Sequence, residues 1–194
     1  MTTITRNTAR ETRIRLACPA DAAAVCAIYA PYVRDTATTF DLEPPTVEEM
    51  EQKIATILEE RPFLVAEIER ADTRAADAAS RVATCAGETF AVIGYSYASA
   101  FRPRKAYLHS IETSVYLAPE AKGFGLGSRL YGALEEILRL QNVYNANACV
   151  TYIEPADKTC PSTSRIFHER RGYVQCAHIP NCGHKFGRWY DILW

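Results

Sequence analysis

Three glycines, Gly123, Gly125 and Gly127, lie between an alternating apolar segment and an amphipathic one. A glycine loop that enters a helix exposes free backbone N–H groups at the positive end of the helix dipole, where phosphate and pyrophosphate groups bind. The spacing Lys122-Gly-Phe-Gly-Leu-Gly127 fits neither the dinucleotide pattern G-x-G-x-x-G nor the Walker pattern G-x-x-x-x-G-K-[ST]. The loop therefore predicts a phosphorylated ligand of another kind, and the alternative is a tight turn that binds nothing.

One carboxylate, Glu112, stands in the otherwise apolar strand that precedes this loop. Burial raises the pKa of a carboxylate, and such a group can take a proton from an ammonium group directly or through water. We therefore expect Glu112 to act as a general base on an amine. The alternative is a glutamate that faces solvent or forms a salt bridge, because strands often carry charges on their outer face.

The loop pattern Lys122-x-x-Gly125-x-Gly127 after a strand resembles the acetyl-CoA loop of the GCN5-related N-acetyltransferases (GNAT), usually written Gln/Arg-x-x-Gly-x-Gly/Ala. The segment Ile14–Asp21 is similar to the first strand and turn of that fold, and Thr39–Asp41 is similar to the segment between its first two helices. The C-terminal half carries a narrower resemblance.

The segment Phe167-His-Glu-x-x-Gly-Tyr173 and the tail Gly183–Trp194 resemble the branch of that family that acetylates phosphinothricin and methionine sulfone. The resemblance covers nearly all of residues 13–194, except the stretch around residues 70–89. It implies an acetyl-CoA-dependent N-acetyltransferase that acts on the primary amine of a small amino acid or analogue by direct attack, without a metal.

The resemblance also implies where acetyl-CoA binds. The backbones of Val115 and Leu117 would bond the pantetheine arm, and the amides from Gly123 to Ser128 would hold the pyrophosphate. Because Lys122 replaces the family's Gln or Arg but keeps a positive charge, we expect altered geometry and retained binding. The cofactor-binding residues expected are Val115, Tyr116, Leu117, Lys122, Gly123, Phe124, Gly125, Leu126, Gly127, Ser128 and Ser164.

The same resemblance assigns the catalytic groups. Glu112 matches the family's general base, and a backbone N–H near Leu117 would polarise the thioester carbonyl. Many relatives protonate the thiolate with a tyrosine on the last helix, where this chain offers His168, whose pKa suits neutral pH. A histidine packed with a satisfied ring is the alternative. Relatives also place an asparagine before this helix, where this chain has Pro161 or Thr163.

Three residues, Phe40, Arg104 and Tyr107, occupy positions that resemble the acceptor pocket of this branch. A guanidinium suits a substrate carboxylate or phosphinate, and aromatic rings can enclose a short side chain. The alternatives are a core phenylalanine, an exposed loop charge and a strand aromatic. The natural acceptor is not identified by these residues.

Composition limits the remaining possibilities. The chain has 194 residues, of which 48% are hydrophobic, and this is enough for one buried core. A net charge of −1 lacks the basic excess of nucleic-acid or anionic-membrane binders, and no apolar run reaches the ~20 residues of a membrane span. The start of the chain has no signal core, and the seven cysteines form no disulfide framework. We expect a cytoplasmic homodimer.

Strands and helices alternate along the chain without internal repeats. Their order predicts an α/β (α+β) fold with a central, mixed, mostly antiparallel sheet that splays at the acetyl-CoA site and is flanked by helices. We expect a flexible extension over 1–12 and one domain over 13–194 with an insertion near 70–89. Strands are expected at 13–17, 63–68, 91–100, 107–117 and 146–153 and in the tail, and helices at 21–32, after the capping box Thr46–Glu49, at 126–138 and at 164–171.

Other classes of protein remain open. The run Cys176-x-His178-x-x-x-Cys182-x-His184 contains zinc-ligand residue types, although its spacing is not that of a usual finger. A non-enzymatic acyl-CoA sensor is favoured by Pro161 and the missing tyrosine, and an acetyltransferase for peptide N-termini is a further alternative. A cysteine nucleophile at Cys149 or Cys160 has no local signature. Zinc content tests the first class, and turnover of acetyl-CoA tests the sensor.

Overall fold

The structure is a computed structural model that describes residues 12–69 and 90–194. The extension at 1–11 and the expected insertion at 70–89 lie outside the described residues. Helices are α1 (Ala22–Asp35), α2 (Val47–Leu58), α3 (Leu126–Leu140) and α4 (Thr163–Arg170), with 3-10 turns η1 (Pro19–Asp21), η3 (Lys105–Tyr107) and η4 (Pro119–Ala121). Strands are β1 (Thr12–Leu16), β2 (Phe63–Glu69), β3 (Phe90–Ala100), β4 (Ser110–Leu117), β5 (Asn145–Asn147), β6 (Val150–Tyr152), β7 (His178–Lys185) and β8 (Arg188–Leu193).

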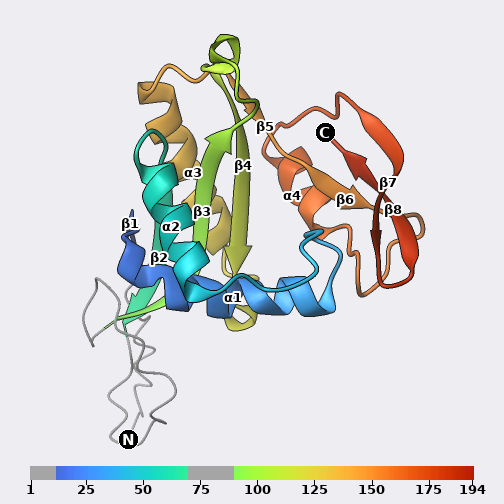
Figure 1. Cartoon of the computed structure of the whole chain (residues 1–194), viewed down its shortest axis with the longest axis horizontal. Helices are drawn as coiled ribbons and strands as arrows, with labels where there is room; N and C mark the ends of the chain where they lie inside the picture. Colours follow the sequence, from blue (N-terminus) through green and yellow to red (C-terminus); the bar gives the residue numbers. More distant parts are fainter. Residues whose placement is uncertain (1–11, 70–89) are drawn as a thin grey trace, which may run out of the picture.

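A five-stranded sheet in the order β1-β2-β3-β4-β5 forms the centre of the molecule. Its strands pair antiparallel except β4 and β5, which are parallel. Helices α1 and α2 cover one face and α3 covers the other (Figure 1). The predicted fold class, a mixed and mostly antiparallel sheet flanked by helices, is confirmed.

The parallel pair is short, and this creates the splay. Strands β4 and β5 are paired only from Ser110 with Asn145 to Glu112 with Asn147. The chain then leaves β4, and β6 joins a second sheet in the order β6-β8-β7, which stands beside the open edge of β4 (Figure 1). The single strand expected at 146–153 is therefore wrong, because two different sheets take its two halves.

Local signals explain most helix boundaries. In the predicted capping box, Thr46 Oγ1 accepts a hydrogen bond from Glu49 N–H, and Glu49 Oε2 accepts one from Thr46 N–H. Along α3 the inward positions Leu126, Leu130, Leu134 and Leu138 are buried, as their spacing predicted.

The expected cap of α1 is different. Asp21 stands at the N-cap position, but its carboxylate makes no capping hydrogen bond. It instead accepts hydrogen bonds from the Arg15 guanidinium and from Cys18 N–H. The ion pair with Arg15 therefore sets the orientation of the Asp21 side chain. The sequence rules for helix caps do not include such a contact.

Two further boundaries differ from the sequence prediction. Strand β4 begins at Ser110, and Tyr107 lies in the η3 turn before it, not in the strand. Thr12, expected in a flexible extension, is already paired in β1.

Cys18 is disulfide-bonded, which the irregular cysteine spacing did not predict. None of the described helices is long and apolar enough to cross a membrane.

Candidate active site

The glycine loop is open and its backbone is bent. Gly123 has φ 86° and Gly125 has φ 73°, values that favour glycine, and no atom lies within 4 Å of where a Cβ would stand on either. The side chain of Phe124 is 82% exposed. Within the described residues no backbone or side-chain acceptor bonds the N–H groups from Gly123 to Ser128. The start of α3 thus offers free donors to an anion, as predicted.

The backbone of β4 faces two directions in alternation. Ala118 N–H donates to Ile93 O, which lies directly opposite on the β3 side, so even-numbered residues of β4 bond β3. The odd-numbered residues Thr113, Val115 and Leu117 turn their N–H and C=O groups toward the gap that β5 leaves open. Two of these, Val115 and Leu117, are the predicted pantetheine contacts.

Tyr116, also expected at the cofactor, is turned away from the gap. Its backbone pairs with Tyr95 on β3, and its ring packs edge-on against the rings of Tyr29 and Tyr32 on α1, with centroids 5.0 and 5.1 Å away. The structure therefore gives Tyr116 a packing role, because residues next to each other on a strand face opposite sides.

A residue that the sequence did not indicate, Tyr32 at the end of α1, reaches the gap. Its hydroxyl donates to Leu117 O at 2.7 Å and accepts from Leu117 N–H at 3.3 Å. The ammonium of Lys122 lies 4.7 Å from the centre of the Tyr32 ring. Both polar groups of Leu117 are thus engaged, whereas those of Val115 have no partner among the described residues.

Glu112 lies in the last residue pair that joins β4 to β5, where the gap begins. Its side chain is half-buried and makes no hydrogen bond or ion pair with any residue that the structure describes. Burial raises the pKa of its carboxyl, and the charge of Arg102 opposes that shift. Glu112 is therefore neither an exposed glutamate nor part of a salt bridge, and it keeps its capacity to accept a proton.

His168 belongs to a buried chain of hydrogen bonds. Its Nδ1 lies 2.8 Å from Ser164 O, and its Nε2 lies 3.0 Å from the Tyr131 hydroxyl. Tyr131 contacts Thr113 Oγ1, which donates to Asn147 O at 3.0 Å. Burial lowers the pKa of the imidazole. Both ring nitrogens are thus partnered, and the imidazole meets β4 only through Tyr131.

The predicted acceptor residues lie in separate places. Phe40 packs so closely on Gly183 that a Cβ there would collide with its ring. Arg104 is exposed beside η3, and Tyr107 is 38% exposed and packs edge-on against Phe101 at 5.9 Å between ring centroids. No contact within the described residues joins Phe40 to either of the other two.

The zinc-like residues do not converge. His178 pairs with Asp191 at 2.7 Å, and His184 packs against Trp189. In the parts of the chain that the structure describes, no three histidine, cysteine or acidic side chains form a group that could hold a metal ion.

The cysteines suggested as nucleophiles have unreactive surroundings. Burial raises the pKa of Cys149 to about 12 and that of Cys160 to about 11. The nearby charge of Glu112 adds to the shift at Cys149. Because a thiol must ionise to attack, these values argue against a cysteine nucleophile.

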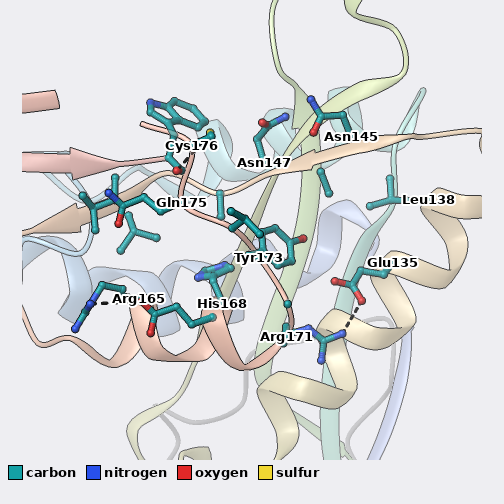
Figure 2. Close-up of a pocket in the computed structure, with 18 of the residues that line it drawn as sticks. Glu135, Leu138, Asn145, Asn147, Arg165, His168, Arg171, Tyr173, Gln175 and Cys176 are labelled. Carbon is teal, nitrogen blue, oxygen red and sulfur yellow. Dashed lines mark hydrogen bonds and ion pairs between the residues drawn. The ribbon is translucent and has the colours of Figure 1, made fainter. Parts of the chain in front are cut away.

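A cavity of about 510 Å³ opens between α3 and α4, behind β5 and β6. Figure 2 shows His168, Tyr173 and Glu135 around it, with Asn147 above. The glycine loop does not line this cavity. The cavity is lined by His168 and Asn147, two residues of the hydrogen-bonded chain, and not by Glu112.

Comparison with known proteins explains this geometry. Residues 85–194 match the family model described as an acetyltransferase (GNAT) domain. The chain belongs to the GNAT family. It is 34% identical to the phosphinothricin N-acetyltransferase of Streptomyces coelicolor, over 95% of this chain and 94% of that protein.

Two other acetyltransferases are similar to this chain. An L-methionine sulfoximine/L-methionine sulfone acetyltransferase of Pseudomonas paraeruginosa is 34% identical over 52% of this chain and 55% of that protein. The crystal structure of a phosphinothricin acetyltransferase from Sinorhizobium meliloti in complex with AcCoA has a TM-score of 0.74 and 30% identity, and the match covers 94% of this chain and 85% of that one.

Within the GNAT fold, the sequence-based selection of site residues was incomplete. It selected the glycine loop and Glu112 from local patterns, but it missed Tyr32, Thr113 and Tyr131. Thr113 directly follows Glu112, and Tyr131 lies on the helix that the loop enters. Both residues are therefore close in sequence to residues that were selected. No spacing rule, however, predicts that the hydroxyls of Thr113 and Tyr131 contact each other.

Proposed function

We propose that this protein transfers an acetyl group from acetyl-CoA to the primary amine of a small amino acid or analogue, by direct attack. The observation that carries this proposal is Glu112, an unpartnered, half-buried carboxylate with a raised pKa at the mouth of the β4–β5 gap. The phosphinothricin and methionine sulfoximine acetyltransferases among its relatives support the choice of acceptor.

The residues present fit acetyl-CoA. The free amides from Gly123 to Ser128 suit its pyrophosphate, and the unpaired C=O of Val115 suits an amide N–H of its pantetheine arm. Because Leu117 is engaged by Tyr32, Val115 N–H is the better candidate to polarise the thioester carbonyl. Ser164 lies in the first turn of α4, where its hydroxyl can add a contact.

Glu112 would make the amine nucleophilic. Acetyl-CoA supplies a thioester whose carbonyl carbon is open to attack. An ammonium group has no free lone pair, so Glu112 must first take its proton. The raised pKa of Glu112 narrows the gap to the ~8 of an α-amino group, which makes this transfer less uphill.

Phe40, Arg104 and Tyr107 are proposed to bind the acceptor. The exposed guanidinium of Arg104 makes no ion pair with a described residue and can meet a carboxylate or phosphinate. Phe40 and Tyr107 offer aromatic surface. Replacing Arg104 with Lys keeps the charge but loses the two-pronged geometry, so KM for the acceptor should rise while binding of acetyl-CoA stays the same.

The test is thiol release from acetyl-CoA across a panel of amines. The panel holds standard amino acids, phosphinothricin, methionine sulfone and methionine sulfoximine, with polyamines, aminoglycosides and peptide N-termini as competing classes. We expect turnover with one of the amino acid analogues, and turnover that is about 10²–10⁴-fold slower with Glu112→Gln at neutral pH. Binding of acetyl-CoA without turnover of any amine would instead favour the sensor, and preference for a peptide would favour the N-terminal acetyltransferase.

A cytoplasmic homodimer remains part of the proposal. The apolar residues Ile179, Phe186 and Trp189 are 43%, 49% and 56% exposed on the hairpin of β7 and β8, which gives a second copy a surface to bind. Sedimentation equilibrium should give twice the 21.7 kDa of one chain. A monomer at micromolar concentration would contradict the dimer and leave the chemistry untouched.

A further inference from the structure

Four hydrogen bonds join two carbonyl oxygens through three side chains. From one end they are Asn147 O to Thr113, Thr113 to Tyr131, Tyr131 to His168 Nε2, and His168 Nδ1 to Ser164 O. The side chains of Thr113 and Tyr131 are almost fully buried. Because a carbonyl oxygen only accepts, every proton in the chain must come from the three side chains.

The number of protons depends on the charge of His168. Thr113 and Tyr131 supply one each, and a neutral imidazole supplies one, so three protons serve four contacts. One contact then brings two acceptors together without a proton, in a buried place where this is costly. An imidazolium supplies two protons and satisfies all four contacts. The four hydrogen bonds are therefore all satisfied only when His168 carries its second proton.

Other groups around His168 act in both directions. Burial and the charge of Arg171 lower its pKa, whereas its bond to Ser164 O and the charge of Glu135 on α3 raise it. Arg171 and Glu135 also form an ion pair at 2.6 Å, so their effects largely cancel. The Tyr173 hydroxyl is buried beside Tyr131 and Thr113. A proton that it gives to either oxygen would serve a fifth contact and would not complete the fourth.

The position of Thr113 links this chain to the reaction. Glu112 and Thr113 are neighbours on β4, so their side chains point to opposite faces of the sheet. Tyr116, which shares a face with Glu112, packs on α1, and Thr113 meets α3. Thr113 also donates to Asn147, the last residue of β5, at the apex of the gap. Base and hydroxyl thus approach the apex from opposite sides.

We infer that Thr113, Tyr131 and His168 form a proton relay that protonates the departing thiolate. This inference rests on the proposed acetyl transfer. When the C–S bond breaks, its electron pair stays on sulfur, and the Thr113 hydroxyl gives up its bond to Asn147 O and passes that proton to the thiolate. Tyr131 then passes its proton to Thr113, and His168 Nε2 passes its proton to Tyr131. His168 ends neutral, and solvent restores its proton. Thr113 touches the leaving group, and Tyr131 and His168 act through it.

The first test needs no turnover. In cofactor-free protein, NMR can follow the protonation of His168, assigned by comparison with His168→Asn. Thr113→Val leaves two contacts that a neutral imidazole fully satisfies, so the titration midpoint should fall by at least about half a pH unit. Thr113→Ser keeps the hydroxyl and should titrate like the unchanged protein. An equal midpoint in the valine variant would overturn the inference.

The second test uses turnover with the acceptor found in the amine panel. Thr113→Val and Tyr131→Phe should lower kcat by about 10–100-fold with unchanged KM for acetyl-CoA, and should remove the fall in rate that deprotonation of His168 causes as pH rises through its lowered pKa. Thr113→Ser should stay within about threefold of the unchanged protein. If the unchanged protein turns over and the valine variant matches its rate and pH profile, the relay fails and the acetyltransferase stands. If the unchanged protein acetylates nothing, the proposed function fails, while the NMR result still tests the chain of protons.

Discussion

Two glutamates in the same sheet have opposite surroundings. Glu67 on β2 is fully buried, and its carboxylate is paired with Arg13 at 2.7 Å and with Arg15 at 2.5 Å. Arg15 in turn binds Asp21. Glu112 on β4 is only half-buried, yet it has no partner among the described residues. The more deeply buried carboxylate is therefore the one that the structure has neutralised.

This contrast shows that burial alone does not mark a functional carboxylate. A buried charge must be paired. The lone pairs of a paired carboxylate accept hydrogen bonds from its partners and are not free to take a proton. Glu112 keeps its lone pairs because it stands where β5 leaves the sheet, and there no described residue forms a hydrogen bond or ion pair with it. The open edge where we propose that acetyl-CoA binds also leaves the proposed base, Glu112, unpaired.

The largest effect that tests this contrast between Glu67 and Glu112 is expected from Glu112→Gln. The amide keeps the size of the side chain but cannot take a proton, so turnover should fall by about 10²–10⁴-fold while the Kd of acetyl-CoA barely changes. Stopped-flow or steady-state thiol release and calorimetry measure the two quantities. Equal turnover at neutral pH would exclude Glu112 as the base.

The pH dependence of turnover, measured for the unchanged protein and for Glu112→Gln, makes this prediction more specific. Because the pKa of Glu112 is raised, the acid limb of the unchanged protein should lie above the ordinary carboxyl value of 4.5. The deficit of the variant should shrink as pH approaches and passes the pKa of the amine, because the acceptor then arrives deprotonated. A constant deficit across that range would mean that Glu112 positions the acceptor.

Glu67→Gln should have the opposite effect. Removing the Glu67 charge takes the counter-charge from the partly exposed Arg13 and one of two from Arg15, which keeps Asp21, so the free energy of unfolding should fall by about 2 kcal/mol, with kcat of the folded protein unchanged. Urea unfolding measures this loss. For Glu112→Gln, stability at neutral pH should be unchanged or higher. A raised folded pKa means that ionisation costs stability as pH rises from the unfolded pKa to the folded one.

A further prediction concerns the glycine loop and the binding of acetyl-CoA. Gly125→Asp places a negative charge and a side chain where a pyrophosphate would lie, and the Kd of acetyl-CoA should rise more than tenfold. Gly125→Asn is the matched control, because asparagine has the same size and tolerates the φ of 73°. If both variants bind equally well, charge at the loop does not govern binding.

The smallest effect is expected at Lys122, whose ammonium lies over the Tyr32 ring on the surface. Lys122→Gln should change the Kd of acetyl-CoA by no more than about threefold, because exposed charges contribute little next to backbone amides. Isothermal titration at two salt concentrations measures this change. A loss as large as that of Gly125→Asp would show that side-chain charge, not the amides, holds the anion.

Local patterns predicted a large part of the molecule. The capping box at Thr46, the leucine spacing of α3 and the glycine loop each depend on residues within a few positions of one another, and each was confirmed as structure. The alternative of a salt-bridged Glu112 does not hold among the described residues, and its role as a base stays a prediction. The failures, such as the split of β5 from β6, occur where a distant element decides the conformation.

The sequence by itself determined the order of elements, the free amides before α3 and the presence of a carboxylate before the loop, because periodicity and glycine content act locally. Only the tertiary structure decided which glutamate is neutralised, which backbone groups of β4 remain open, and that hydroxyls on β4 and α3 meet His168 on α4. Those contacts join residues from 18 positions apart, for Thr113 and Tyr131, to 85 positions apart, for Tyr32 and Leu117. Their geometry arises from the packing of the sheet against its helices, which no local pattern contains.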